Sequence, residues 1–237
     1  MTWLYALKFD LFFLFHLIKM KNLISYKLLL FTLCSSVQSL TITLTKDNHV
    51  SIKDSISPTT SSKFINDIEQ LKNKNIYIYI NSPGGSVLEG EKIIQYMEYK
   101  KLTNHTLLCI ADKAYSMAFH IFQQCSFRYV LPSSSIMQHQ MSLEISGSLK
   151  NIHNYINFIE RINKRFINIE SKKLNITKNE YKKRIESDWW LYGEEIIKEK
   201  GADLLLGAVG CHKELLISNT NVVVGTSVVI VSDCPLI

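Results

Sequence analysis

The 237-residue sequence lacks the patterns that indicate a metal site or a thiol-based redox site. It has no CxxC pair and no set of cysteines and histidines at zinc-ligand spacing. We therefore expect no metal and no thioredoxin-like function. The five cysteines are Cys34, Cys109, Cys125, Cys211 and Cys234.

The sequence also lacks a dense run of positive charge. Its net charge is +6, but the lysines are spread through segments rich in Asn and Ile. Nucleic-acid binding depends on clustered basic side chains, so we predict solvated lysine faces and no nucleic-acid partner. The 46% hydrophobic content is enough for one large core.

A third absence concerns the apolar first 39 residues, which contain no uninterrupted run long enough to span a bilayer. The runs at 11–18 and 28–34 are far shorter than the roughly 20 apolar residues that a spanning helix needs. A signal peptide starting at Met20 fits better, with 28–34 as its apolar core and cleavage after Ser39. A signal anchor remains the alternative. No arginine precedes Arg128, which argues against a mitochondrial presequence.

A secretory or membrane-associated location would change the chemistry of two kinds of site. The triplets at 104–106 (NHT) and 175–177 (NIT) would become glycosylation sequons, although chance explains such triplets in an Asn-rich chain. In an oxidising lumen Cys125 could pair with Cys211.

From residue 40 onward, strand and helix patterns alternate, which predicts an α/β domain over 40–218 with a largely parallel sheet, followed by an apolar tail over 219–237. Strands are expected as a paired opening at 41–52, then at 75–80, 105–111, 128–131, 135–139 and 202–206, with a hairpin-like segment at 142–147. Helices are expected at 61–71, 87–101, from 115 or 116 to 124, at 148–173, and near 177–187 and 193–200. The tail run VVVGTSVVIV is β-rich and could form an edge strand.

Ser116 lies where a predicted strand gives way to a predicted helix. At such a point a side chain is exposed at the carboxyl edge of a parallel sheet, beside a helix N-terminus that favours negative charge. A nucleophilic serine also needs a base, a carboxylate to hold the base, and N–H donors for the oxyanion. Taken alone, Ser116 is better explained as a helix N-cap than as a nucleophile.

Four motifs in one order change this interpretation: INSPGGSV, AYSMAF, LPSSSIMQHQ and SDWWLYGEEIIKEKGAD. Together, over about 76–206, they resemble the ClpP-like serine peptidase family, the proteolytic subunits of Clp proteases. The resemblance implies a crotonase-like fold of repeated ββα units with a protruding handle helix, here at 148–173. It places Ser116, His139 and Asp188 at the family's catalytic serine, histidine and aspartate. This chain order differs from those of chymotrypsin and subtilisin.

The resemblance implies a serine endopeptidase that forms an acyl-enzyme and needs no cofactor. The N–H groups of Gly85 and Met117 would hold the oxyanion, because a glycine turn lets the backbone approach a substrate closely. Peptides or unfolded proteins are the implied substrates, and the handle implies a homo-oligomer. The family's N-terminal axial-loop region is replaced here, so an AAA+ unfoldase partner is not carried over and stays an open alternative.

Other residues compete for these roles. His120 lies one helical turn beyond Ser116, away from the helix N-terminus, so we expect a packed histidine there. Lys113 would be the base in an alternative Ser/Lys dyad. Asp203, in Gly-Ala-Asp, is assigned a structural role.

Two departures from the family pattern keep a second function open. Asp112, Lys113 and Tyr115 stand before the serine where the family has small residues, and Met141 replaces a proline after His-Gln. These changes leave a catalytically inactive ClpP-like scaffold or adaptor as the alternative. A crotonase-fold enzyme acting on acyl-CoA is disfavoured by the Ser/His/Asp set.

Overall fold

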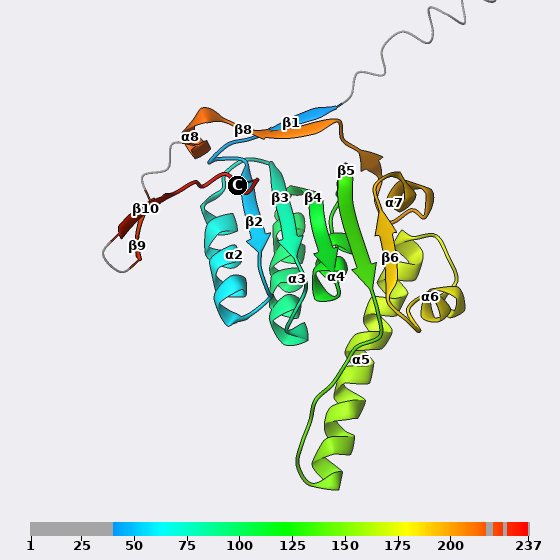
Figure 1. Cartoon of the computed structure of the whole chain (residues 1–237). Helices are drawn as coiled ribbons and strands as arrows, with labels where there is room; N and C mark the ends of the chain where they lie inside the picture. The colour runs from blue at the N-terminus through cyan, green and yellow to red at the C-terminus, as the bar shows by residue number, and fades with distance from the viewer. Residues whose placement is uncertain (1–39, 217–219, 225–226, 237) are drawn as a thin grey trace, which may run out of the picture. The chain divides into compact units, whose positions relative to one another are not determined.

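A computed structural model describes residues 40–216, 220–224 and 227–236 (Figure 1). The chain divides into two compact units, Met1–Ser39 and Leu40–Ile237. The predicted signal peptide or anchor, Cys34 and the boundary at 218/219 lie outside the described residues.

Within the described ranges, no helix combines the length and the apolar character needed to cross a membrane.

A six-stranded sheet forms the centre of the second unit. Four strands run parallel in the order β2-β3-β4-β5, β6 joins β5 in the antiparallel sense, and β7 pairs in parallel with part of β5. The strands are β2 (His49–Lys53), β3 (Asn75–Ser82), β4 (Thr106–Tyr115), β5 (Phe127–Gln138), β6 (Trp189–Tyr192) and β7 (Leu204–Leu205). Consequently β4 and β5 end at the same edge of the sheet.

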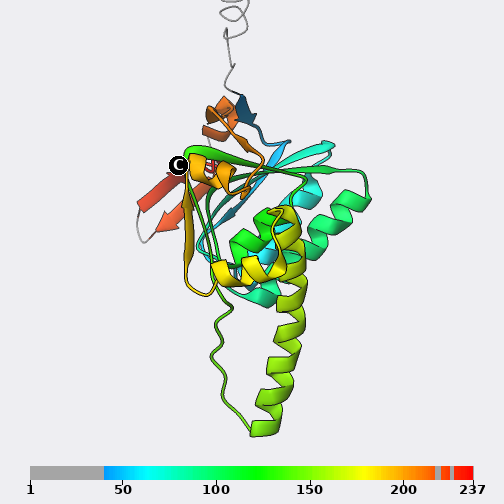
Figure 2. The same cartoon turned by 90° about the vertical axis from the view of Figure 1, so that its right-hand side faces the viewer.

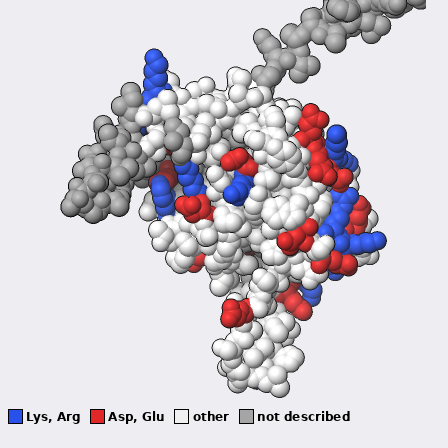
Figure 3. All heavy atoms as spheres, viewed as in Figure 1, with Lys and Arg blue, Asp and Glu red and all other residues white. Residues whose placement is uncertain are grey.

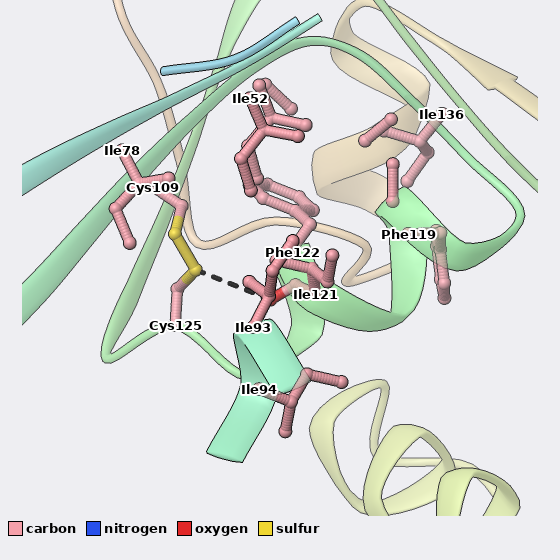
Figure 4. Packing of buried hydrophobic residues seen from close by; sticks show 14 of the residues in the cluster. Ile52, Ile78, Ile93, Ile94, Cys109, Phe119, Ile121, Phe122, Cys125 and Ile136 are labelled. Atoms are coloured by element: carbon pink, nitrogen blue, oxygen red, sulfur yellow. Dashed lines mark hydrogen bonds between the residues drawn. A yellow bond between two sulfur atoms is a disulfide. The ribbon is translucent and has the colours of Figure 1, made fainter. Parts of the chain in front are cut away.

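Helices cover one face of this sheet. They are α2 (Pro58–Gln70), α3 (Val87–Leu102), α4 (Met117–Gln123), α5 (Leu149–Lys173), α6 (Lys178–Arg184) and α7 (Glu194–Lys198). Alternate strand residues such as Ile52 and Ile78 point into the same core as Ile93 of α3 and Phe122 of α4 (Figure 4). Residues of opposite parity, such as Tyr79 and Ile110, enter a second cluster on the other face.

Helix α5 is packed along only part of its length. Phe166 and Ile167 near its C-terminal end are buried, whereas Leu149 at its start is 74% exposed. Figures 1 and 2 show this helix projecting beyond the sheet, with the segment 139–148 running beside it. The hairpin expected at 142–147 is not formed, because this extended segment pairs with no strand.

The opening strands do not pair with each other as predicted. Strand β1 (Thr41–Leu44) pairs in parallel with β8 (Ala208–Cys211), while β2 pairs with β3. The two strands predicted at 128–131 and 135–139 form the single strand β5, which accommodates Pro132 beside an irregularity in its register with β4. The short helix α8 (Lys213–Leu216) follows β8.

The apolar tail forms a hairpin. Strand β9 (Thr220–Val224) pairs in the antiparallel sense with β10 (Ser227–Val231), so the VVVGTSVVIV run supplies both partners itself.

The cysteine pairing predicted from the sequence is wrong. Cys125 is bonded to Cys109, with 5.8 Å between their Cα atoms, and Cys211 is bonded to Cys234, at 5.9 Å. Cys125 follows α4 and packs beneath β4 in the helix-covered core (Figure 4). Cys211 lies on β8 beside the other cluster, so the two cysteines of the predicted pair belong to different cores.

Asp203 binds the buried Arg128, in keeping with its assigned structural role. Arg128 Nε lies 3.1 Å and its backbone N–H donor 2.8 Å from Asp203 Oδ2, and Arg128 Nη2 lies 2.5 Å from Oδ1. Partial burial alone would raise the pKa of the Asp203 carboxyl, but the hydrogen bonds and charge of Arg128 hold that pKa below its usual value. The pair thus ties the segment before β7 to β5.

We expect Asp203→Asn to lower the free energy of unfolding at pH 7 by about 2 kcal/mol, because Arg128 would be left buried without its counter-charge. This loss of stability is smaller than that expected for a fully buried ion pair, because the Asp203 side chain is 37% exposed to solvent. A lowered folded-state pKa stabilises the fold above the unfolded pKa, near 3.8, and this contribution is lost as pH falls through the folded pKa. The gap between wild type and variant in urea unfolding should therefore shrink from pH 7 to pH 3. Equal stabilities at pH 7 would contradict this account.

Candidate active site

Ser116 occupies a strained turn between β4 and α4. Its φ of 52° and ψ of −119° lie outside the regions that non-glycine residues usually adopt. The Ser116 N–H donates to Met137 O at 2.9 Å, which ties the turn to β5. Strain of this kind costs free energy and persists where the surroundings enforce it, commonly at functional sites.

His139 lies beside Ser116 because β4 and β5 are parallel neighbours. Tyr115 pairs with Met137 at the end of the ladder; Ser116 follows Tyr115 directly, and His139 lies two residues after Met137. His139 Nε2 and Ser116 Oγ are 2.9 Å apart, and both residues are half-buried. This distance allows proton transfer from the hydroxyl to the ring nitrogen.

Asp188 and His139 directly follow the last paired residues of β6 and β5, and no hydrogen bond joins their side chains. The antiparallel pairing of β5 and β6 ends with Gln138 opposite Trp189, so His139 and Asp188 are the next two residues opposite one another. Residues opposite each other on such strands have Cβ atoms about 4.5–5.5 Å apart. Asp188 is exposed and makes no hydrogen bond or ion pair within the part of the chain that the structure describes.

Gly84 packs directly against the serine turn. Its φ is +92°, and a Cβ at this position would lie 2.5 Å from Tyr115 O, 2.8 Å from Ser116 Cβ and 2.9 Å from Met117 N. No side chain fits there without moving the turn. The motif predicted a close backbone approach of this glycine turn to a substrate, with Gly85 as the donor, but not the packing of Gly84 against the serine turn.

The predicted oxyanion donors are the backbone N–H groups of Gly85 and Met117, and both are free of hydrogen bonds to the described residues. Gly84 O accepts from Ile56 N at 2.8 Å and Ser86 N donates to Ile56 O at 2.9 Å, so the Gly85 N–H points away from Ile56. Met117 is the first residue of α4, and its N–H has no partner inside the helix. Neither N–H donates to an acceptor among the described residues.

The rival bases are engaged elsewhere. His120 is buried, and its Nδ1 binds Glu170 Oε1. Lys113 is exposed on β4, where its Nζ lies 5.8 Å from the centre of the Tyr115 ring.

On the face shown in Figure 3, lysines and arginines are interspersed with acidic side chains.

These features define an α/β domain with a hydrogen-bonded serine and histidine, Ser116 and His139, at the carboxyl edge of its sheet. Residues 35–201 match the Clp protease family, so the chain belongs to that family. This result confirms the family and the fold class that the sequence motifs predicted.

Three curated relatives agree with this assignment. The chain is 35% identical over 135 residues to an ATP-dependent Clp protease proteolytic subunit of Borrelia garinii subsp. bavariensis, covering 56% of this chain and 69% of the relative. It is 35% identical over 127 residues to the subunit of the same name in Borreliella afzelii, covering 53% and 64%. It is 34% identical over 134 residues to proteolytic subunit 1 of Borreliella burgdorferi, covering 56% and 69%.

Proposed function

We propose that this protein is a serine endopeptidase that hydrolyses peptide bonds through Ser116, His139 and Asp188. The observation that carries the proposal is the 2.9 Å separation between Ser116 Oγ and His139 Nε2 in a strained turn. Membership of the Clp protease family supports it, as do similar proteins named proteolytic subunits.

Each residue has a defined task in this reaction. Ser116 Oγ attacks the peptide carbonyl carbon while His139 Nε2 takes its proton, and the Gly85 and Met117 N–H groups bind the oxyanion. His139 then passes the proton to the leaving amine as the C–N bond breaks, which leaves an acyl-enzyme on Ser116. Water attacks the acyl group while His139 takes its proton, and His139 then returns that proton to Ser116 Oγ as the ester bond breaks and the acid product departs. Asp188 accepts from His139 Nδ1 and stabilises the imidazolium.

Homo-oligomerisation through α5 is part of the proposal. Tyr155 and Phe158 are each 37% exposed on the projecting half of the helix, and Leu149 is 74% exposed. A second copy of the chain would remove these apolar surfaces from water.

Reaction of the full-length protein with a fluorophosphonate probe tests the proposal without knowledge of the substrate. We expect the wild type to be labelled, Ser116→Ala to lose labelling completely, and His139→Ala to fall by about 10³-fold or more because the hydroxyl loses its base. Lys113→Ala is the matched control for the rival dyad and should label at the wild-type rate. A folded wild type that reacts no faster than Ser116→Ala would favour an inactive scaffold, for which the uncontacted Asp188 is the supporting observation.

A further inference from the structure

Four buried polar side chains from four elements meet behind the Ser116–His139 pair. They are His120 of α4, Gln138 of β5, Glu170 of α5 and Tyr181 of α6, with exposed fractions of 7%, 1%, 0% and 1%. Burying such groups costs free energy unless each finds a hydrogen-bond partner. The proposed reaction uses none of them directly.

The four side chains form one continuous line of hydrogen bonds. Tyr181 donates its hydroxyl proton to Glu170 Oε2, and Glu170 Oε1 binds His120 Nδ1. The Gln138 amide nitrogen lies 3.1 and 3.2 Å from the two ring nitrogens of His120. Gln138 Oε1 accepts the backbone N–H of His139 at 3.0 Å.

The line has a direction. Burial, with the nearby Glu170 charge adding to it, raises the pKa of Tyr181, so its hydroxyl keeps its proton and donates. His120 Nδ1 faces Glu170, and the Gln138 amide nitrogen lies against the imidazole at nearly equal distances from its two nitrogens. Stacking on the Phe166 ring, with 4.0 Å between ring centroids, fixes the plane of the imidazole.

This arrangement allows only one orientation of the Gln138 amide. The reverse orientation would place its NH₂ group against the His139 N–H, donor against donor. His139 has just left the β5 ladder, and among the described residues the Gln138 oxygen is the only acceptor for its N–H. The sheet therefore holds the backbone up to Gln138, whereas the next N–H, that of His139, is held by a side chain.

We propose that Gln138 is a positioning residue, which holds His139 at hydrogen-bond distance from Ser116 and is itself oriented by His120, Glu170 and Tyr181. The inference rests on the proposed function, because it assigns a task relative to the catalytic histidine. It also links α5 and α6 to the active site, since both helices contribute to the line.

The test replaces Gln138 by leucine in the full-length protein, which keeps a buried side chain of comparable volume and removes the hydrogen bonds of the amide. We expect the maximal rate of fluorophosphonate labelling to fall by about 10- to 100-fold, because small misplacements of a catalytic group have effects of this size. The probe concentration that gives half-maximal rate should change less than twofold. If Gln138 had a purely structural role, the variant would lose thermal stability, and its maximal labelling rate would not fall selectively while the half-maximal probe concentration stayed the same.

Two further variants complete the test. His120→Phe should slow labelling as well. The double variant that carries both His120→Phe and Gln138→Leu should be no slower than Gln138→Leu alone, since the effects of substitutions within one coupled unit do not add. Phe122→Leu, a core change on α4 outside the line, is the stability control and should label within threefold of the wild type. If Gln138→Leu does not fold, Tyr181→Phe removes only the hydroxyl that bonds to Glu170 and Gln138, and should slow labelling severalfold.

The outcomes separate the two proposals. Wild-type labelling rates in Gln138→Leu, or in Tyr181→Phe where the first variant does not fold, overturn the positioning role and leave the endopeptidase intact. Additive effects in the double variant also overturn it. A wild type that is not labelled at all overturns both.

Discussion

Replacing Gly84 by alanine should leave a folded protein whose fluorophosphonate labelling is about 10³-fold slower than that of the wild type. The new Cβ would lie within 3 Å of Tyr115 O, Ser116 Cβ and Met117 N, and the φ of +92° disfavours any L side chain. The turn must move, which displaces the nucleophile and the Met117 N–H together. Loss of one oxyanion donor alone costs about 10²- to 10³-fold, and misplacement of the serine adds to this.

Two other glycines provide the comparison for this variant. A Cβ at Gly210, on β8, would meet no atom within 4 Å, so Gly210→Ala should label like the wild type. Gly85→Ala would collide with Ile56 O and N at 2.5 and 2.8 Å, which moves the Gly85 N–H without touching the serine turn. We therefore expect Gly85→Ala to retain more activity than Gly84→Ala. Wild-type labelling by Gly84→Ala would show that the turn is not held by this contact.

Elements with a clear hydrophobic period were predictable from the sequence. The NIYIYI run alternates into two cores and forms β3, and the spacing of Ile93, Ile94 and Met97 matches the buried face of α3. The stripe of α5 was likewise visible, with an observed start at Leu149 after the N-cap Ser148. These elements carry local signals that the tertiary structure only reinforces.

The missed features depend on partners distant in the sequence. Trp189–Tyr192 has no alternation that marks a strand, and becomes β6 only because β5 offers a free edge. Strand β1 pairs with β8, which lies more than 160 residues later. The Cys109–Cys125 bond follows from α4 folding back under β4, and spacing alone could not select it.

The sequence motifs were sufficient to predict the residues of the site, but not the buried side chains that pack behind them. The motifs placed Ser116 and His139 in the positions that the structure brings to 2.9 Å. His120 was expected to be a packed histidine, and it is buried as expected. Its partner Glu170 lies 50 residues away on α5, and no local pattern links the two.

A large effect on labelling is expected at Asp188. Among the described residues its carboxylate has no hydrogen-bond partner, yet the register of β5 and β6 places it opposite His139. We expect Asp188→Asn to slow fluorophosphonate labelling by about 10⁴-fold, the size of effect seen when an amide favours the wrong histidine tautomer. The reason is that an aspartate that accepts from Nδ1 leaves Nε2 free to take the serine proton. For this to hold, Asp188 must reach His139 by side-chain rotation over the short distance between opposite residues.

Glu186→Gln is the matched control for Asp188→Asn, because it removes one exposed carboxylate two residues away in the same connection between α6 and β6. It should label at the wild-type rate, which separates a specific contact from a general loss of negative charge. If Asp188→Asn labels within threefold of wild type while His139→Ala does not, His139 works without a carboxylate partner. The buried line through Gln138 would then be the remaining support that holds the base toward Ser116.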